Sequence, residues 1–300
     1  MIIIRVNIIG AGSIGLLFAH QLQICGHSIH ISTRSDEQAH TLNKNGVTAP
    51  QSQAVKVAAS QIDKTTFNES EAVIIAVKQY HLNEILPALR RVPDHIPLIF
   101  LQNGMSHLTY LSSIPHKHIF VSTVEHGSKK LNSHTYQHNG IGWWRIACYR
   151  GDSKLVDRFT ACNRTDFPVA FEDNYEILLT VKLIKNLMIN PLTALFNVRN
   201  GELEANARYR EMMKLLYSEI MFIFPEAVTH CRLDDIFDLC MKTAENESSM
   251  LSDIKAGRKT EIEAMTGYAT KIAEEKKVKP LIIPFLENAI LAIQEREEKN

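Results

Sequence analysis

The 300-residue sequence lacks net charge and lacks the cysteine and histidine patterns of a metal protein. Lys plus Arg and Asp plus Glu both total 33, so the bulk charge attracts neither nucleic acid nor an anionic membrane. The five cysteines form no CxxC pair, and His134 and His138 lie in a stretch rich in Asn and Gly rather than on a predicted helix. We therefore expect a cytoplasmic protein in a reducing compartment that binds a small molecule, with no metal, nucleic acid or membrane as partner.

Long uninterrupted apolar runs are also missing. The longest candidate, residues 177–196, is interrupted by Lys182, Lys185, Asn186 and Asn190, and the apolar start at residues 1–5 is too short for a signal peptide. With 45% hydrophobic residues the chain can still bury a full core, and its length suggests about two domains.

Short apolar runs alternate with helical patterns in the first half of the chain. Ser35, with Gln38 at the capping-box spacing, begins a short predicted helix that ends at Gly46. Buried strands separated by helices form parallel sheets covered on both faces. Residues 136–149 have the pattern of a hairpin added to the sheet. The other predicted elements are a helix at 12–25, ended by Gly26, and strands at 6–9, 28–32, 72–77, 98–101 and 119–124.

The pattern changes near Phe167 and Pro168, where helical periodicity begins to dominate. We predict helices at residues 174–196, 207–224, 234–241, 244–256, 261–276 and 281–297. The expected fold is α/β with a mostly parallel sheet in residues 1–170, followed by an all-α domain in residues 171–300.

A glycine-rich string, Gly10-Ala11-Gly12-Ser13-Ile14-Gly15, stands between the first predicted strand and the first predicted helix. Gly10 permits a tight turn, Gly12 lets the backbone approach a pyrophosphate, and Gly15 lets the helix pack against the strand. The helix N-terminus offers N–H groups to the phosphates. This context predicts a dinucleotide-binding site, and a glycine turn without a ligand is the alternative.

The end of the second predicted strand, Ile31-Ser32-Thr33-Arg34, has no acidic residue. NAD sites place an acid there to bind the ribose hydroxyls, whereas an arginine pairs with the 2′-phosphate of NADP. Arg34 therefore favours NADPH/NADP+ as the cofactor. NAD stays open as the alternative cofactor because Asp36 and Glu37 are close in sequence. The alternative role for Arg34 is a solvent-exposed residue without a ligand.

Lys78 and Asn103 follow two other predicted strands, in the strings AVIIAVK and LIFLQNG. Ligands of open α/β sheets bind beyond the carboxyl ends of the strands, which predicts both residues beside the cofactor. The string Gln102-Asn103-Gly104 is equally compatible with a plain turn, because Asn-Gly favours positive φ.

Three polar residues, Lys182, Asn186 and Asn190, recur every four residues in an otherwise apolar predicted helix. Each step of four advances about 40° past a full turn, so the three side chains share one narrow face, while Lys185 falls outside it. Buried polar groups need partners, and a polar ligand would supply them. The alternative is a structural lysine paired with a carboxylate, with both asparagines bonded to other helices.

A second polar cluster occupies residues 246–250 and 258–263. Its serines have the position of helix caps and Glu261 that of a first-turn acid, so neither segment alone predicts a site.

Together these strings resemble the ketopantoate reductase (2-dehydropantoate 2-reductase) family. The matching strings span the chain: GAGSIG at 10–15, AVK at 76–78, QNGM at 102–105, KLIKNLMINPLTAL at 182–195, NGEL at 200–203 and SSMLSDI with RKTEIE at 248–263. The pattern KxxxNxxxNPLTAL followed by SSMLxDI is far more specific than a glycine motif. The resemblance implies a Rossmann domain joined to a helical domain, and an oxidoreductase that uses NADPH to reduce 2-dehydropantoate to pantoate in pantothenate and coenzyme A biosynthesis.

The resemblance also implies roles for individual residues. Lys182 matches the family's catalytic proton donor, and Glu261 matches an acid that borders both the cofactor and this lysine. The remaining matches bind substrate, at Asn103, Asn186, Asn190, Asn200 and Ser249, or the cofactor, at Gly10, Ala11, Gly12, Ser13, Ile14, Gly15, Arg34, Lys78, Asn103, Ser128 and Glu261.

Two departures from the family pattern concern the substrate pocket rather than the reaction. Trp143-Trp144 stands where many members have small residues, and Thr180-Val181 precedes the lysine where an aromatic is common. A related NADP-dependent enzyme that acts on another 2-keto or 3-hydroxy acid therefore stays open, as does a non-catalytic NADPH-binding sensor of the same fold. The sequence leaves the oligomeric state open, a homodimer included.

Overall fold

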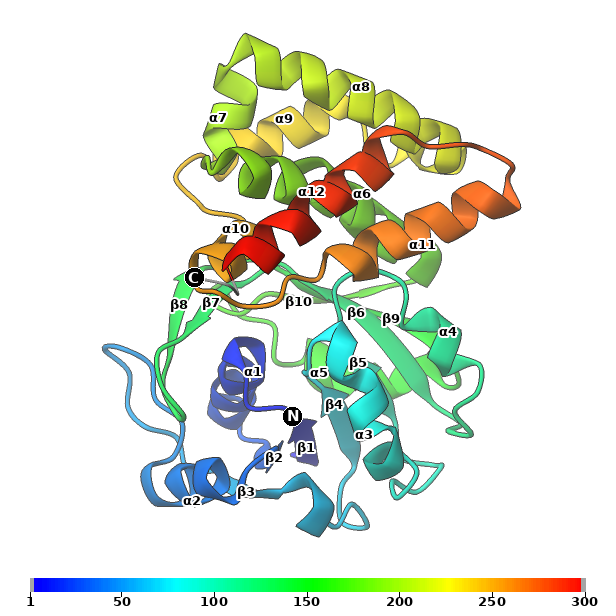
Figure 1. The fold of residues 1–300 in the computed structure, drawn as a ribbon. Coiled ribbons are helices and arrows are strands. Elements are labelled where there is room, and N and C mark those ends of the chain that lie inside the picture. Colours follow the sequence, from blue (N-terminus) through cyan, green and yellow to red (C-terminus); the bar gives the residue numbers. More distant parts are fainter. Residues whose placement is uncertain (1–2, 298–300) are drawn as a thin grey trace. The chain divides into compact units, whose positions relative to one another are not determined.

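In the part of the chain that the structure describes, eight strands between Arg5 and Glu172 form one mostly parallel sheet (Figure 1). The computed structural model describes residues 3–297, which divide into two units. The first unit extends to Gln102 and resumes over Leu108–Leu178. The second consists of Asn103–His107 and the chain from Leu179 onward.

The strand order of this sheet is β10-β9-β6-β5-β4-β1-β2-β3. All neighbouring pairs are parallel except β6 and β9, which are antiparallel. The prediction of a mostly parallel sheet is confirmed. The strands are β1 (Arg5–Ile9), β2 (Ser28–Thr33), β3 (Ala58–Gln61), β4 (Ala72–Ile75), β5 (Leu98–Phe100), β6 (Ile119–Val124), β9 (Trp144–Arg150) and β10 (Val169–Glu172).

The predicted start of the second helix is confirmed, but its capping box is only half formed. Ser35 Oγ accepts the Gln38 N–H (3.3 Å), whereas the Gln38 side chain donates to the carbonyls of Ala11 and Ser133 instead of returning to the cap. Gly46 ends this helix with a φ of 69°. The helices of the first unit are α1 (Ser13–Ile24), α2 (Asp36–Asn45), α3 (Leu82–Leu89), α4 (Leu108–Leu111) and α5 (Asp157–Thr160).

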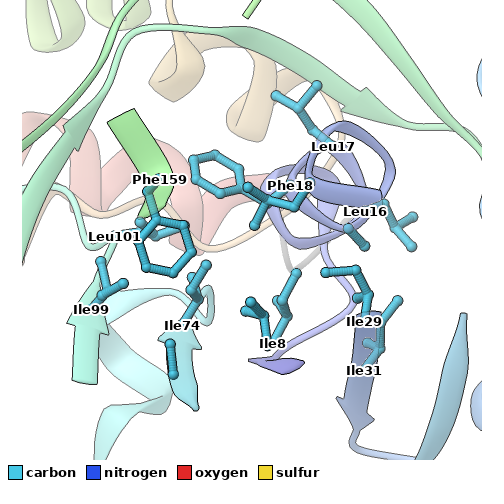
Figure 2. Packing of buried hydrophobic residues seen from close by; sticks show 14 of the residues in the cluster. Ile8, Leu16, Leu17, Phe18, Ile29, Ile31, Ile74, Ile99, Leu101 and Phe159 are labelled. Atoms are coloured by element: carbon cyan, nitrogen blue, oxygen red, sulfur yellow. The ribbon is translucent and has the colours of Figure 1, made fainter. Parts of the chain in front are cut away.

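Apolar side chains of the central strands meet α1 in the core of the first unit. Figure 2 shows Ile8 and Ile74 of the sheet in one cluster with Phe18 of α1. The Phe18 ring lies edge-on to Trp144, with 4.8 Å between ring centres, and to Phe167, with 5.4 Å. Aromatic contacts of this geometry add to the hydrophobic stabilisation that burial supplies.

The predicted hairpin at residues 136–149 is wrong. β8 (Tyr136–Gly140) pairs with β7 (Gly127–Lys130) in a separate two-stranded sheet, whereas β9 joins the main sheet between β6 and β10. Burial explains the difference. β9 buries Trp144 and Ile146 in the main sheet, while β8 is mostly polar and buries Tyr136, whose hydroxyl is hydrogen bonded to His20 of α1 (3.1 Å).

The described residues of the second unit form helices and turns, with no strand. The predicted helix at 244–256 begins only at Ser249, because residues 243–246 form a turn closed by the Asn246 N–H on Thr243 O (2.9 Å). The helices are α6 (Tyr175–Phe196), whose first turn belongs to the first unit, α7 (Asn200–Ala205), α8 (Ala207–Ile223), α9 (Leu233–Lys242), α10 (Ser249–Lys255), α11 (Ile262–Glu275) and α12 (Ile282–Glu297).

One helix of the described chain, α6, is long and apolar enough to cross a membrane by length and composition alone. In its most apolar window 67% of the residues are buried inside the protein. The core helix of a globular protein has the same properties, so this feature is weak evidence for a membrane span.

Replacing Trp144 by alanine tests the aromatic core. Trp144 is 0% exposed, so we expect the free energy of unfolding to fall by about 3–5 kcal/mol in urea denaturation followed by circular dichroism. The matched control is Trp143→Ala, because Trp143 is 39% exposed and should change the free energy by less than about 1 kcal/mol. Equal effects of the two substitutions would contradict the placement of Trp144 in the aromatic core.

Candidate active site

The predicted cofactor residues of the first unit follow three adjacent parallel strands. Ile9 of β1 is in register with Ser32 of β2 on one side and with Ile75 of β4 on the other. The glycine turn, Arg34 and Lys78 therefore leave the sheet at the same edge. Ligands of open α/β sheets bind at this edge, beyond the carboxyl ends of the strands.

The glycine turn packs so closely that two of its positions exclude a side chain. Gly10 has a φ of 109°, and a Cβ there would lie 2.9 Å from Val77 Cγ1. A Cβ on Gly15 would lie 1.9 Å from the Gly10 carbonyl oxygen. A Cβ on Gly12 would meet nothing within 4 Å, and no side chain caps α1 at this residue. The arrangement leaves space beside a helix N-terminus, which fits a bound phosphate.

Side chains from β7 and α2 hold the glycine turn by its carbonyl groups. Ser128 Oγ donates to Ser13 O (3.0 Å), and Lys130 Nζ donates to Ala11 O (3.0 Å). Gln38 Nε2 donates to the same Ala11 oxygen (3.1 Å). Ser128 was a predicted cofactor contact, but Lys130 was missed. The available signal was the spacing of two within one strand, which places Ser128 and Lys130 on the same face.

Arg34 is exposed in the turn that follows β2. Thr33 Oγ1 fixes this turn by donating to Ser35 O (2.8 Å). The carboxylate of Asp36, which had kept NAD open, forms an ion pair with Lys64. The acid nearest in sequence to Arg34 is therefore engaged by another cation.

The ends of β4 and β5 are joined by one side chain. Gln102 Nε2 donates to the carbonyls of Ile75 (3.0 Å) and Val77 (2.8 Å). Lys78 follows directly and begins the 3₁₀ turn Gln79–His81. Gln102 was not predicted to have this role, and it fixes the chain immediately before Lys78 and immediately before Asn103.

Within the second unit, the segment Asn103–His107 packs against α11. Asn103 Nδ2 donates to Glu261 Oε2 (3.1 Å), and Ser106 Oγ donates to Ala264 O (3.0 Å). Gly104 has a φ of 75°, and a Cβ there would lie 2.4 Å from the same Ala264 oxygen. Gly104 has the positive φ that Asn-Gly favours, and the segment brings two predicted site residues, Asn103 and Glu261, into contact; contact of Asn103 with a cofactor stays a prediction.

The predicted polar face lies on α6. Lys182 and Asn186 are half-buried, and Asn190 is 7% exposed. Their neighbours Leu183 and Leu187 are buried, as expected for an apolar helix. The carboxamides of Asn186 and Asn190 form no hydrogen bond with another residue of the described chain. These two groups are therefore available to bind a polar ligand.

The turn of α6 that carries Lys182 also contacts the Asn103 segment. Thr180 Oγ1 donates to Met105 Sδ (3.7 Å), and Thr180 lies two residues before Lys182. Asn103, Glu261 and this turn of α6 therefore belong to one connected part of the second unit.

The serines at the start of α10 divide into a cap and an exposed residue. Ser248 Oγ accepts the Leu251 N–H (3.1 Å) and the Thr193 hydroxyl (2.7 Å), which caps α10 and ties it to α6. Ser249 is the first residue of the helix and is exposed. The cap interpretation is confirmed for Ser248, and a substrate role for Ser249 stays a prediction.

Asn200 is buried and bonded within the second unit. Its Nδ2 donates to Thr243 Oγ1 (3.0 Å), and its backbone N–H donates to Asn246 O (3.0 Å). A Cβ on Gly201 would lie 2.5 Å from Ala244 Cβ. The NGEL string thus holds α7 against the turn before α10, and contact of Asn200 with substrate stays a prediction.

Two family models match most of the chain. "Ketopantoate reductase PanE/ApbA" matches residues 6–151, and its C-terminal counterpart matches residues 178–294. The chain belongs to the ketopantoate reductase family. The 2-dehydropantoate 2-reductase of Bacillus subtilis (strain 168) is 33% identical over 299 residues, which cover 98% of this chain and 99% of the relative. Members of this family are oxidoreductases, and so is the present chain.

Two solved structures have the same fold as this chain. A probable 2-dehydropantoate 2-reductase from Bacillus subtilis is 32% identical with a TM-score of 0.83, covering 96% of this chain and 99% of its own. D-mandelate dehydrogenase, solved with NADH and anilino(oxo)acetate, has a TM-score of 0.87 at 18% identity, covering 98% and 99%. At that identity the second likeness shows the fold alone.

Substitutions in the glycine turn separate its packing from its binding role. Gly15→Ala forces a Cβ against the Gly10 carbonyl and should lower the free energy of unfolding by more than about 2 kcal/mol. Gly12→Ala should leave the melting temperature near that of the wild type and weaken dinucleotide binding, measured by nicotinamide fluorescence. Unimpaired binding by a folded Gly12→Ala variant would remove the phosphate assignment.

Proposed function

We propose that the protein reduces 2-dehydropantoate to pantoate with NADPH, in the biosynthesis of pantothenate and coenzyme A in the cytoplasm. The polar face of α6, with Lys182, Asn186 and Asn190, carries the proposal, because it presents an amine and two available carboxamides on a largely buried helix. The 2-dehydropantoate 2-reductase activity named for the Bacillus subtilis relative supports it. In this proposal residues 1–170 bind the cofactor and residues 171–300 carry the proton donor.

Residues of the first unit fit an NADP-type cofactor. The open space at Gly12 and the uncapped start of α1 suit the pyrophosphate. Arg34 suits a 2′-phosphate, since the Asp36 carboxylate is paired with Lys64. Lys78 adds a further positive charge at the same edge of the sheet. NADPH, when bound, supplies the hydride that the keto carbon accepts.

Lys182 is the proposed proton donor. Reduction of a keto group leaves negative charge on the former carbonyl oxygen, which a nearby ammonium group stabilises and then protonates. A positioned acid of this kind contributes about 10²–10⁴-fold to the rate. Asn186, Asn190 and Ser249 bind the hydroxyl and carboxylate of the substrate and limit its rotation before the reaction.

Asn103 and Glu261 act as a pair in this proposal. The bond from Asn103 Nδ2 to Glu261 Oε2 fixes which end of the amide faces the acid. The amide oxygen and the second N–H of Asn103 are then directed elsewhere, where they can bind substrate or cofactor. Glu261 thereby orients Asn103 and places a negative charge in the part of the second unit that also includes the Lys182 turn.

Turnover of a panel of 2-keto acids, followed by NADPH oxidation, tests the reaction itself. We expect the highest kcat/KM with 2-dehydropantoate. A higher value with phenylglyoxylate, or with another 2-keto acid, would replace the proposed substrate. NADPH binding without turnover of any keto acid would instead support a sensor.

Lys182→Ala tests the proton donor. We expect kcat to fall by about 10²–10⁴-fold, with the dissociation constant of NADPH close to that of the wild type. Lys185→Ala is the matched control, because Lys185 lies on the same helix but near Cys231 and Asp235. Steady-state kinetics and a fluorescence titration measure the two quantities. Wild-type turnover by Lys182→Ala would eliminate the proposed role.

Arg34→Ala tests the choice of cofactor. Loss of a charge-assisted contact to the 2′-phosphate should raise KM for NADPH by about 10-fold or more. KM for NADH, which lacks this phosphate, should change by less than about 3-fold. If both values rise equally, Arg34 does not recognise the 2′-phosphate.

A further inference from the structure

A second cation lies beside Arg34 at the glycine turn. Lys130 is the last residue of β7, and its Nζ donates to Ala11 O (3.0 Å). Burial and the charge of Arg34, in that order, lower the pKa of Lys130. The two positive groups are therefore close enough to repel each other.

Within residues 3–297 no carboxylate offsets this repulsion. Neither Arg34 nor Lys130 forms an ion pair, and Asp36 is paired with Lys64 instead. Two cations held together without a counter-charge are unfavourable in the protein alone, and a bound anion removes the penalty. The pair thus has the charge pattern of an anion-binding site.

Lys130 is exposed, and the carbonyl that it contacts belongs to a turn held by further side chains. Gln38 Nε2 donates to the same Ala11 oxygen (3.1 Å) and to Ser133 O (2.7 Å). Ser128, on the same face of β7, donates to Ser13 O (3.0 Å). An ammonium group has three N–H donors, so two remain after the bond to Ala11. Lys130 therefore contacts the turn through one N–H and can bind an anion with the other two.

We propose that Lys130 and Arg34 together bind the 2′-phosphate of NADPH, which makes Lys130 a second determinant of the choice between NADPH and NADH. This inference rests on the proposed use of NADPH. A phosphate monoester carries about −1.5 to −2 charge and three strong acceptor oxygens, which one arginine does not saturate. Lys130, a second cation at the glycine turn, supplies further donors.

Binding of two nucleotides without a nicotinamide ring tests the inference. Isothermal titration of the full chain compares adenosine 2′,5′-bisphosphate with 5′-AMP, which differ only in the 2′-phosphate. Lys130→Met should weaken binding of the bisphosphate by about 10- to 100-fold and binding of 5′-AMP by less than about 2-fold. Lys130→Arg should restore most of the loss. Lys129→Met is the control: Lys129 is as exposed as Lys130 but points to the opposite face of β7, and this variant should bind both nucleotides as the wild type does.

Several outcomes would overturn the inference. Equal weakening of both nucleotides by Lys130→Met, with an unchanged melting temperature, would mean that Lys130 only supports the turn. If Lys130→Met binds both nucleotides as the wild type does, Lys130 is not part of the site. If Arg34→Ala abolishes the preference for the bisphosphate while Lys130→Met retains it, the role of Lys130 fails and NADPH use stands. A wild-type chain with no preference would overturn NADPH use and the role of Lys130 together.

Discussion

The lack of a side chain at Gly10 and at Gly15 determines how closely the elements of the first unit can pack. A Cβ on Gly15 would lie 1.9 Å from the Gly10 carbonyl, and one on Gly10 would lie 2.9 Å from Val77. The helix α1 can therefore begin directly beyond β1 and beside the end of β4 only when both residues are glycine. The carbonyls of Ala11 and Ser13 take their positions from this close approach, and β7 and Gln38 bind those carbonyls.

Local signals in the sequence predicted most helices and strands of the two units. The Ser35 cap and the glycine that ends α2 depend on contacts within a few residues, and both are confirmed. Pairing of strands depends on distant partners, so the hairpin at residues 136–149 was wrong. β9 carries the apolar residues that the main sheet can bury, and β8 does not. The polar string of β8 was the signal that could have separated the two.

The candidate site likewise contains features that follow from local spacing and contacts that join distant residues. Lys182, Asn186 and Asn190 share one helix, and their spacing alone predicts a common face. The contact between Asn103 and Glu261 joins residues 158 positions apart, and that between Lys130 and Ala11 joins residues 119 apart. Periodicity contains no information about such pairs. The family resemblance supplied individual residues such as Glu261, but the partner of each came from the fold.

The short excursion at Asn103–His107 also limits how the protein can be dissected. The chain enters the second unit there, returns to the first unit at Leu108, and leaves it again at Leu179. A single cut near Leu178 would therefore deprive the helices of the segment that donates to Glu261 and Ala264. A recombinant fragment that begins there would lack both of these hydrogen bonds unless the five residues were supplied with it.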